Sequence, residues 1–325
     1  MKRLTLFLLV TALVLSCSKN TPPVIESLVA EPDSVYPGDT VTLTFRVSDI
    51  DGDGIAHMFH KPAGTWIMNI GTGDPAQWIA PKVPGDYYLT LTISDLTDKV
   101  ADSVKIHVMD TTGVFTDSRD GHQYKWVRIG KQVWMAENLA WLPEVYPGIV
   151  GSTDTALYYV YDYEGYSVEL AKMTENYHKY GVLYNWRAAS GGERNSSTVP
   201  SGVQGVCPND WHLPSLDEFS LLLTPHSQVQ TDLLSESGWR GEYNGSNKRG
   251  FNVFPGGFRA TWGGDFIFSA EYLMALFWTT NDCYLYWRSE AYVSVVRFVS
   301  LPVQGGHDPW SQWDEGLSVR CLKNE

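Results

Sequence analysis

A short apolar stretch ended by a cysteine, at the start of the chain, constrains everything that follows it. Lys2 and Arg3 precede twelve largely apolar residues, 4–15, and Ser16-Cys17 comes directly afterwards. A basic start, a short apolar core and a small residue at the break are the layout of a secretory signal. A membrane-spanning helix needs roughly 20 apolar residues, more than this stretch supplies. The rest of the chain is therefore expected to fold after export, where disulfide bonds form.

The run Val14-Leu15-Ser16-Cys17 resembles a bacterial lipobox. Cleavage before Cys17 would leave this cysteine as the mature N-terminus, with lipid on its sulfur. Each buried acyl methylene contributes roughly 0.8 kcal/mol, so several chains hold a soluble domain on a membrane. We therefore predict a signal peptide over residues 1–16, a lipidated tether over residues 17–22, and anchoring to the outer membrane, at the cell surface or on its periplasmic face. The alternatives are an ordinary signal peptide with a chance cysteine, and an uncleaved anchor.

The composition indicates a packed, acidic ectodomain. The chain has 325 residues, of which 43% are hydrophobic and 13% aromatic, and this length favours two domains. A formal net charge of −13 without a basic cluster argues against nucleic acid and anionic lipid headgroups as partners. Four cysteines are present, so once Cys17 carries lipid at most one intramolecular disulfide can form.

Residues 23–109 are expected to form a β-sandwich. Val41, Leu43, Phe45 and Val47 alternate with polar residues, which is the pattern of a half-buried strand. The same alternation recurs at residues 89–93 and 104–108, and Pro-Gly-Asp turns occur at 37–39 and 84–86. The segment resembles the immunoglobulin-like and PKD-like modules of bacterial surface proteins. The resemblance implies a spacer between the anchor and a functional domain.

Three alternate carboxylates in this segment suggest a calcium site. Asp49, Asp51 and Asp53 lie on a glycine-rich turn, and calcium prefers such hard oxygen ligands. An EF-hand would require an acidic ligand at the twelfth loop position, which is His60. The alternative is a solvated turn between strands, and no other cofactor is expected.

Residues 110–325 are expected to form an α+β domain with long irregular segments. Eleven of the thirteen tryptophans lie there, and no period of 20–50 residues recurs. A capping box begins a helix at Ser215, with Glu218 reaching back to it. Another helix is expected over 182–189. Short strands are expected around 125–129, 132–135, 277–280 and 294–298.

Five motifs in this region carry a family resemblance. They are DGHQYKWVRIGKQVWMAENL (120–139), YGVLYNWRAAS (180–190), GVCPNDWHLPSLDEF (205–219), GFNVFPGGFR (250–259) and LSVRCLKNE (317–325). Together they resemble the Fibrobacter succinogenes major paralogous domain, which is found in many lipoproteins and secreted proteins of Bacteroidetes and Fibrobacter relatives. The resemblance covers residues 110–325. It implies location and architecture more than an activity.

A second likeness concerns the fold and the cysteines. WHLPSLDEF and the terminal VRC are similar to segments of formylglycine-generating enzymes, which implies a variant of the C-type lectin fold for residues 110–325. Those enzymes use two cysteines five residues apart to bind copper, but Trp278 and Arg288 occupy these positions around Cys283. We therefore expect no enzyme activity.

Two family motifs contain the remaining cysteines, Cys207 and Cys321. An oxidising compartment favours a disulfide between them, with two buried free thiols as the alternative. Cys283 is then the odd thiol.

The tryptophan-rich end of the chain is the expected binding face. Exposed tryptophan rings stack on sugars or anchor protein partners. Trp134, Trp186, Trp211 and Trp278 are expected in the core, whereas the candidate ligand-binding residues are Trp287, Trp310, Trp313, Arg259 and Trp262. The resulting hypothesis is a non-catalytic binding or adhesion lipoprotein for polysaccharide or an envelope protein. The alternatives are an enzyme on a lectin-like fold that uses Cys283, and a purely structural envelope protein.

Overall fold

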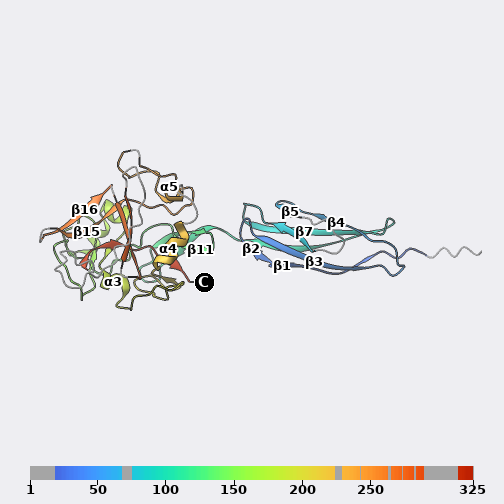
Figure 1. Ribbon diagram of the computed structural model, residues 1–325, viewed down its shortest axis with the longest axis horizontal. Helices are drawn as coiled ribbons and strands as arrows, with labels where there is room; N and C mark the ends of the chain where they lie inside the picture. The colour runs from blue at the N-terminus through green and yellow to red at the C-terminus, as the bar shows by residue number, and fades with distance from the viewer. Residues whose placement is uncertain are drawn as a thin grey trace, which may run out of the picture. The chain divides into compact units, whose positions relative to one another are not determined.

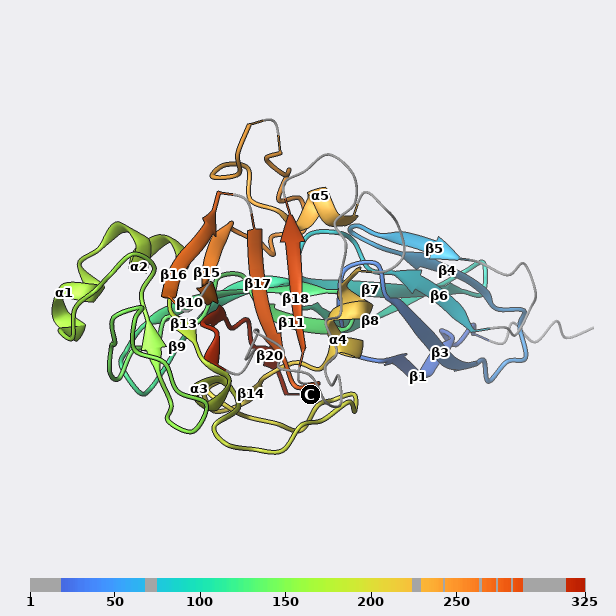
Figure 2. The same ribbon diagram turned by 60° about the vertical axis from the view of Figure 1, so that its left-hand side comes forward.

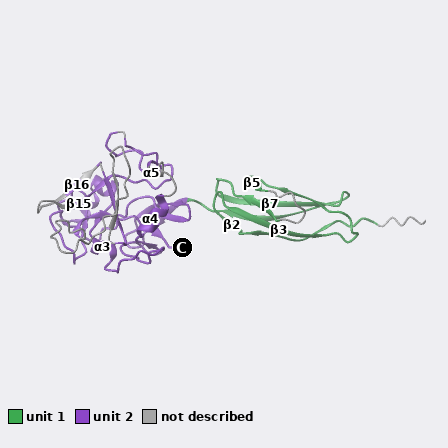
Figure 3. Ribbon diagram, viewed as in Figure 1, with its two compact units in different colours: residues 1–111 green, residues 112–325 purple. Residues whose placement is uncertain are grey.

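The computed structural model describes residues 19–67, 75–223, 229–241, 243–262, 265–272, 274–281, 283–288 and 314–324. The chain divides into two compact units between Thr111 and Thr112, coloured separately in Figure 3. Most regular structure is β-sheet, and the helices are few and short (Figure 1). Among the described residues, no helix has the length and apolar character needed to cross a membrane.

The first unit is an all-β sandwich of two four-stranded sheets. One sheet has the order β1 (Val24–Glu31), β3 (Thr40–Ser48), β6 (Ala76–Ile79) and β5 (Thr65–Ile67); the other has the order β2 (Ser34–Val35), β8 (Lys99–Val108), β7 (Gly85–Ser94) and β4 (Ala56–His60). Every second residue of β3 and β7 faces the core, where Val41, Leu43 and Leu89 are fully buried. The alternation predicted from the sequence is confirmed here, and the sandwich is compatible with an immunoglobulin-like fold.

The second unit combines a five-stranded and a seven-stranded sheet. The five-stranded sheet has the order β14 (Trp211–His212), β20 (Leu322–Lys323), β11 (Gln132–Met135), β10 (Gln123–Ile129) and β9 (Thr112–Thr116). The seven-stranded sheet has the order β12 (Tyr158–Tyr159), β13 (Leu183–Tyr184), β19 (Leu317–Ser318), β17 (Met274–Thr279), β15 (Gly256–Trp262) and β16 (Asp265–Glu271), with β18 (Cys283–Arg288) beside β17 (Figure 2). The helices are α1 (Val168–Lys172), α2 (Glu175–Tyr180), α3 (Trp186–Ser190), α4 (Leu216–Leu223) and α5 (Val229–Leu233).

Large aromatic side chains build the core of the second unit. Trp134, Trp186, Trp211 and Trp278 are all buried, as predicted. The rings of Trp186 and Trp278 lie 5.3 Å apart, and the indole N–H of Trp278 donates to the carbonyl of Tyr184 at 2.7 Å. Because so much of the chain is irregular, these side chains supply the buried area that longer helices and strands would otherwise supply.

The capping box at the start of α4 is confirmed. The backbone N–H of Ser215 donates to Oε2 of Glu218 at 2.8 Å, and the N–H of Glu218 donates to Oγ of Ser215 at 3.3 Å. Each side chain thus satisfies a donor that the helix end leaves unpaired. The strands predicted around 125–129, 132–135 and 277–280 are present as β10, β11 and β17.

The helix predicted over residues 182–189 is wrong in its first half. Leu183 and Tyr184 instead form β13, which pairs with β12 and β19. Helix α3 starts only after Asn185, whose Oδ1 accepts from the N–H of Ala188 at 2.9 Å. Pairing with two distant strands overrides the local apolar pattern. The strand predicted around 294–298 lies outside the described residues.

The predicted disulfide between Cys207 and Cys321 is present, with an S–S distance of 2.06 Å. The two cysteines are 114 residues apart in the sequence, and both are buried. The bond joins the segment before α4 to the segment between β19 and β20. It closes residues 207–321, just over half of the second unit, into one covalent loop.

Replacing Cys207 and Cys321 together by serine should lower the free energy of unfolding of the second unit by about 4–5 kcal/mol, because the loop it opens is long. Urea denaturation followed by tryptophan fluorescence measures this difference. Cys283→Ser is the matched control and should leave the midpoint unchanged. Equal midpoints for the wild type and the double variant would contradict the prediction.

Candidate functional site

Arg259, which the sequence suggested for an exposed binding face, lies in the interior. It is fully buried on β15. Its Nε donates to the carbonyl of Gly148 at 2.9 Å and its Nη2 to that of Val150 at 3.2 Å, while Nη1 lies 3.3 Å from Oδ1 of Asp314. The guanidinium also covers the ring of Tyr159 at 4.8 Å. Arg259 therefore joins core segments rather than presenting a charge to a surface ligand.

The other candidates on the expected binding face are placed only in part. Trp262 ends β15, and Trp287 pairs with Ala275 of β17 from its position in β18. Trp310 and Trp313 lie outside the described residues, as does Cys17. Cys283 begins β18 opposite Thr279. The described backbone thus places Trp262 and Trp287 on two different strands, β15 and β18, which both neighbour β17.

The carboxylates of the proposed calcium turn accept backbone hydrogen bonds. Oδ1 of Asp49 accepts from the N–H of Asp51 at 2.8 Å and of Asp53 at 3.3 Å. Oδ2 of Asp51 accepts from Thr21 at 2.7 Å. In the part of the chain that the structure describes, no three histidine, cysteine or acidic side chains are grouped to hold a metal ion. Calcium binding by this turn stays a prediction.

A buried carboxyl lies beside Arg259. Glu315 is only 6% exposed, and burial raises its pKa to about 7, with the charge of Arg259 opposing and that of Asp314 adding to the rise. The native state therefore holds a proton on Glu315 at a pH where the unfolded chain, with a carboxyl pKa of about 4.5, has released it.

The free energy of unfolding of the second unit should consequently decrease as the pH rises from about 4.5 to about 7. Glu315→Gln should remove the part of this decrease that deprotonation of Glu315 causes. The difference between the two pKa values corresponds to at most about 3 kcal/mol. Urea denaturation of both proteins at pH 4.5 and pH 8 measures it, with Glu169→Gln on the exposed face of α1 as control. The same pH slope for wild type and Glu315→Gln would refute the assignment.

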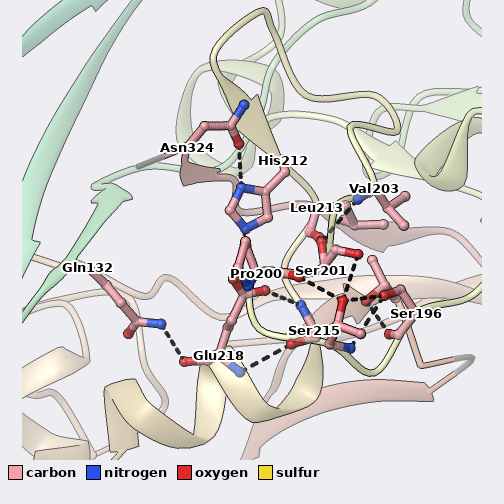
Figure 4. Close-up of polar contacts among 12 residues, drawn as sticks. Gln132, Ser196, Pro200, Ser201, Val203, His212, Leu213, Ser215, Glu218 and Asn324 are labelled. Atoms are coloured by element: carbon pink, nitrogen blue, oxygen red, sulfur yellow. Dashed lines mark hydrogen bonds and ion pairs between the residues drawn. The ribbon is translucent and has the colours of Figure 1, made fainter.

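A second buried polar cluster joins β14 to α4 and the chain end (Figure 4). Nε2 of His212 lies 2.9 Å from Oε1 of Glu218, and its Nδ1 lies 2.7 Å from Oδ1 of Asn324. The amide of Gln132 donates to the carbonyl of Glu218 at 2.9 Å. The capping box revealed Glu218, but no sequence pattern pointed to His212 as its partner.

This cluster has the composition of a general-base site but not its geometry. Such a site needs a nucleophile within hydrogen-bond reach of a histidine nitrogen. Both ring nitrogens of His212 are already occupied, and Oγ of Ser215 accepts from the backbone of Glu218. The contacts of His212 therefore fix β14, α4 and the chain end.

A surface pocket of the second unit lies over α3. Its volume is about 560 Å³, within the range of roughly 300–1,000 Å³ that is typical of ligand sites. We call it the α3 pocket. It is lined by residues from the 153–154 loop, from α3 and from the loop that follows: Thr153, Asp154, Trp186, Arg187, Ser190, Gly192, Glu193, Arg194 and Asn195.

The buried side chain of Asn185 holds two walls of the α3 pocket together. Its Oδ1 accepts from the N–H groups of Leu157 and Ala188 at 3.0 and 2.9 Å. Its Nδ2 donates to the carbonyls of Ser152 and Thr155 at 2.7 and 2.8 Å. One fully satisfied amide therefore caps α3 and fixes the loop that carries Thr153 and Asp154.

The third wall is fixed by short backbone contacts. Oε1 of Glu193 accepts from the N–H of Gly205 at 3.0 Å, and the N–H of Gly192 donates to Oγ of Ser190 at 3.2 Å. A Cβ at Gly192 would lie 2.6 Å from Nη1 of Arg187, and its φ is +79°. The positive φ favours glycine at this position, and the guanidinium of Arg187 lies beside the loop backbone.

A smaller pocket of about 200 Å³ lies near α2 and includes Arg320. Burial lowers the pKa of Arg320 to about 9. Its Nη2 donates to Oδ1 of Asn138 at 2.5 Å, and its Nη1 donates to the carbonyl of Phe251. Because this deep charge is already used inside the fold, the α3 pocket is the stronger candidate for a ligand.

The protein thus has two β-rich units, and the second carries the disulfide and the polar α3 pocket. The sequence pattern of the Fibrobacter succinogenes major domain matches residues 127–323, more than half of the chain, and the chain belongs to this family. A search of curated proteins finds no match. The disulfide and every residue that lines the α3 pocket lie within the matched span.

Proposed function

We propose that this protein is an exported lipoprotein, anchored to the outer membrane through Cys17, whose second unit binds polysaccharide or another envelope component without catalysing a reaction. The family is a surface-associated domain, and the first unit serves as a spacer. A C-type-lectin-like fold of the second unit is in keeping with its short strands and long irregular segments.

The lining of the α3 pocket carries the proposal. It combines hydroxyl, amide, carboxylate and guanidinium groups with Trp186. A sugar presents hydroxyl groups that both donate and accept, so its recognition requires this mixture of side chains. Asn185 and Glu193 hold the walls in place, which reduces the entropy lost when a ligand binds.

The chain from Lys19 onward should bind at least one member of a broad plant and bacterial polysaccharide array. Thr153→Trp should abolish that binding, because the bulky ring occupies the α3 pocket from an exposed position. Thr116→Trp, the same change at an exposed position of β9, is the control and should bind as the wild type does.

Repeating the array with calcium and with a chelator tests whether Asp49, Asp51 and Asp53 contribute. If folded protein bound no polysaccharide on the array, this would argue against a polysaccharide site in the α3 pocket. Equal loss of binding in both tryptophan variants would argue against it as well.

Lipid anchoring is tested separately in a bacterial host. Wild-type protein should incorporate labelled fatty acid and sediment with membranes, whereas Cys17→Ala should do neither, because the acyl chains supply the membrane affinity. Cys283→Ala is the matched control. Membrane sedimentation of Cys17→Ala would mean that another segment holds the protein there.

A further inference from the structure

We propose that the α3 pocket selects acidic sugar residues, and that Arg187 and Arg194 bind their carboxylate or sulfate groups. The inference rests on the proposed polysaccharide binding and adds the class of sugar and the residues that recognise it. It does not require a catalytic step.

The charges in the pocket are the first observation. Both arginines are exposed, on a chain with a net charge of −13. Within the described residues neither guanidinium makes an ion pair or hydrogen bond, although Asp154 and Glu193 line the same pocket. The two guanidinium groups therefore keep their N–H donors for a ligand, whereas Oε1 of Glu193 already accepts from the N–H of Gly205.

The position of Arg187 is the second observation. Its backbone belongs to α3, which the buried Asn185 caps. Its guanidinium lies against Gly192, at a place where any other residue would put a Cβ. The guanidinium therefore lies beside the 192–195 loop, so its charge is part of the pocket lining.

The chemistry of the guanidinium sets the class of ligand. Its planar fork of N–H donors matches a carboxylate or sulfate with two parallel hydrogen bonds. The nearby carboxylate of Asp154 suits the sugar hydroxyl groups and repels a second anion. The lining therefore fits a ring that carries one acidic group among several hydroxyls, such as a uronic acid or a sulfated sugar.

The test uses the chain from Lys19 onward, which includes both compact units, and two matched pairs of polymers. Polygalacturonate is compared with its fully methyl-esterified form, and dextran sulfate with dextran, by affinity electrophoresis and calorimetry. The wild type should prefer the acidic member of at least one pair, and the two pairs separate carboxylate from sulfate.

Arg187→Ala and Arg194→Ala should each weaken binding to the preferred acidic polymer by about 10-fold or more, since each removes a charge-assisted hydrogen bond. Arg187→Lys should recover part of the loss because it keeps the charge but not the fork. Arg240→Ala, at an exposed site outside the pocket, is the control and should bind as the wild type does. All variants should retain the thermal midpoint of the wild type.

Equal binding to the acidic and neutral polymers, or unchanged binding by both arginine variants, would overturn this inference while leaving polysaccharide binding in place. Weakening by Arg240→Ala to the same extent would also overturn it, since general charge attraction would then explain the preference. Failure of the wild type to bind any polysaccharide would overturn the proposed function together with the inference.

Discussion

The fold of the second unit depends on one segment, residues 317–323, which is buried except for Lys323. Its first part, β19, pairs with β13 and β17 in the seven-stranded sheet, and its last part, β20, pairs with β11 and β14 in the five-stranded sheet. Val319, Arg320 and Cys321 between them are all buried. Seven consecutive residues thus connect both sheets by hydrogen bonds and carry half of the disulfide, so strands far apart in the sequence are all aligned against the same short segment.

Two buried arginines, Arg259 and Arg320, donate hydrogen bonds to the backbone of irregular segments in the core. Carbonyl groups in irregular segments have no partner from a helix or sheet, and leaving them unpaired in the core is costly. Arg259 reaches the carbonyls of Gly148 and Val150, and Arg320 reaches that of Phe251 and the amide of Asn138. Each guanidinium offers five donors, which offset part of the cost of burying its charge.

Period-two alternation predicted the strands of the first unit, and the Ser215 capping box predicted the start of α4, because both signals are local. The burial of Arg259 could not be read from the sequence, since arginine is usually exposed and its partners Gly148 and Val150 lie 111 and 109 residues away. The predicted start of α3 is wrong for the same reason, because Leu183 and Tyr184 form a strand only through their pairing with β12 and β19. Asn185, a good capping residue, was the local signal for the true start. Nothing local marked the α3 pocket.

Three consecutive residues show how the fold and the pocket are linked. Asn185 is buried and ties the 152–155 loop to α3, Trp186 packs against Trp278, and Arg187 is exposed in the pocket. The first two positions serve the core, so changing them would disturb the whole unit. The remaining pocket residues lie mainly on the loops around 153–154 and 192–195, whose side chains are exposed. Such loops can change without altering the scaffold that holds them. Under the proposed function, substitutions in these loops would change the ligand preference of the pocket while leaving the disulfide and both sheets in place.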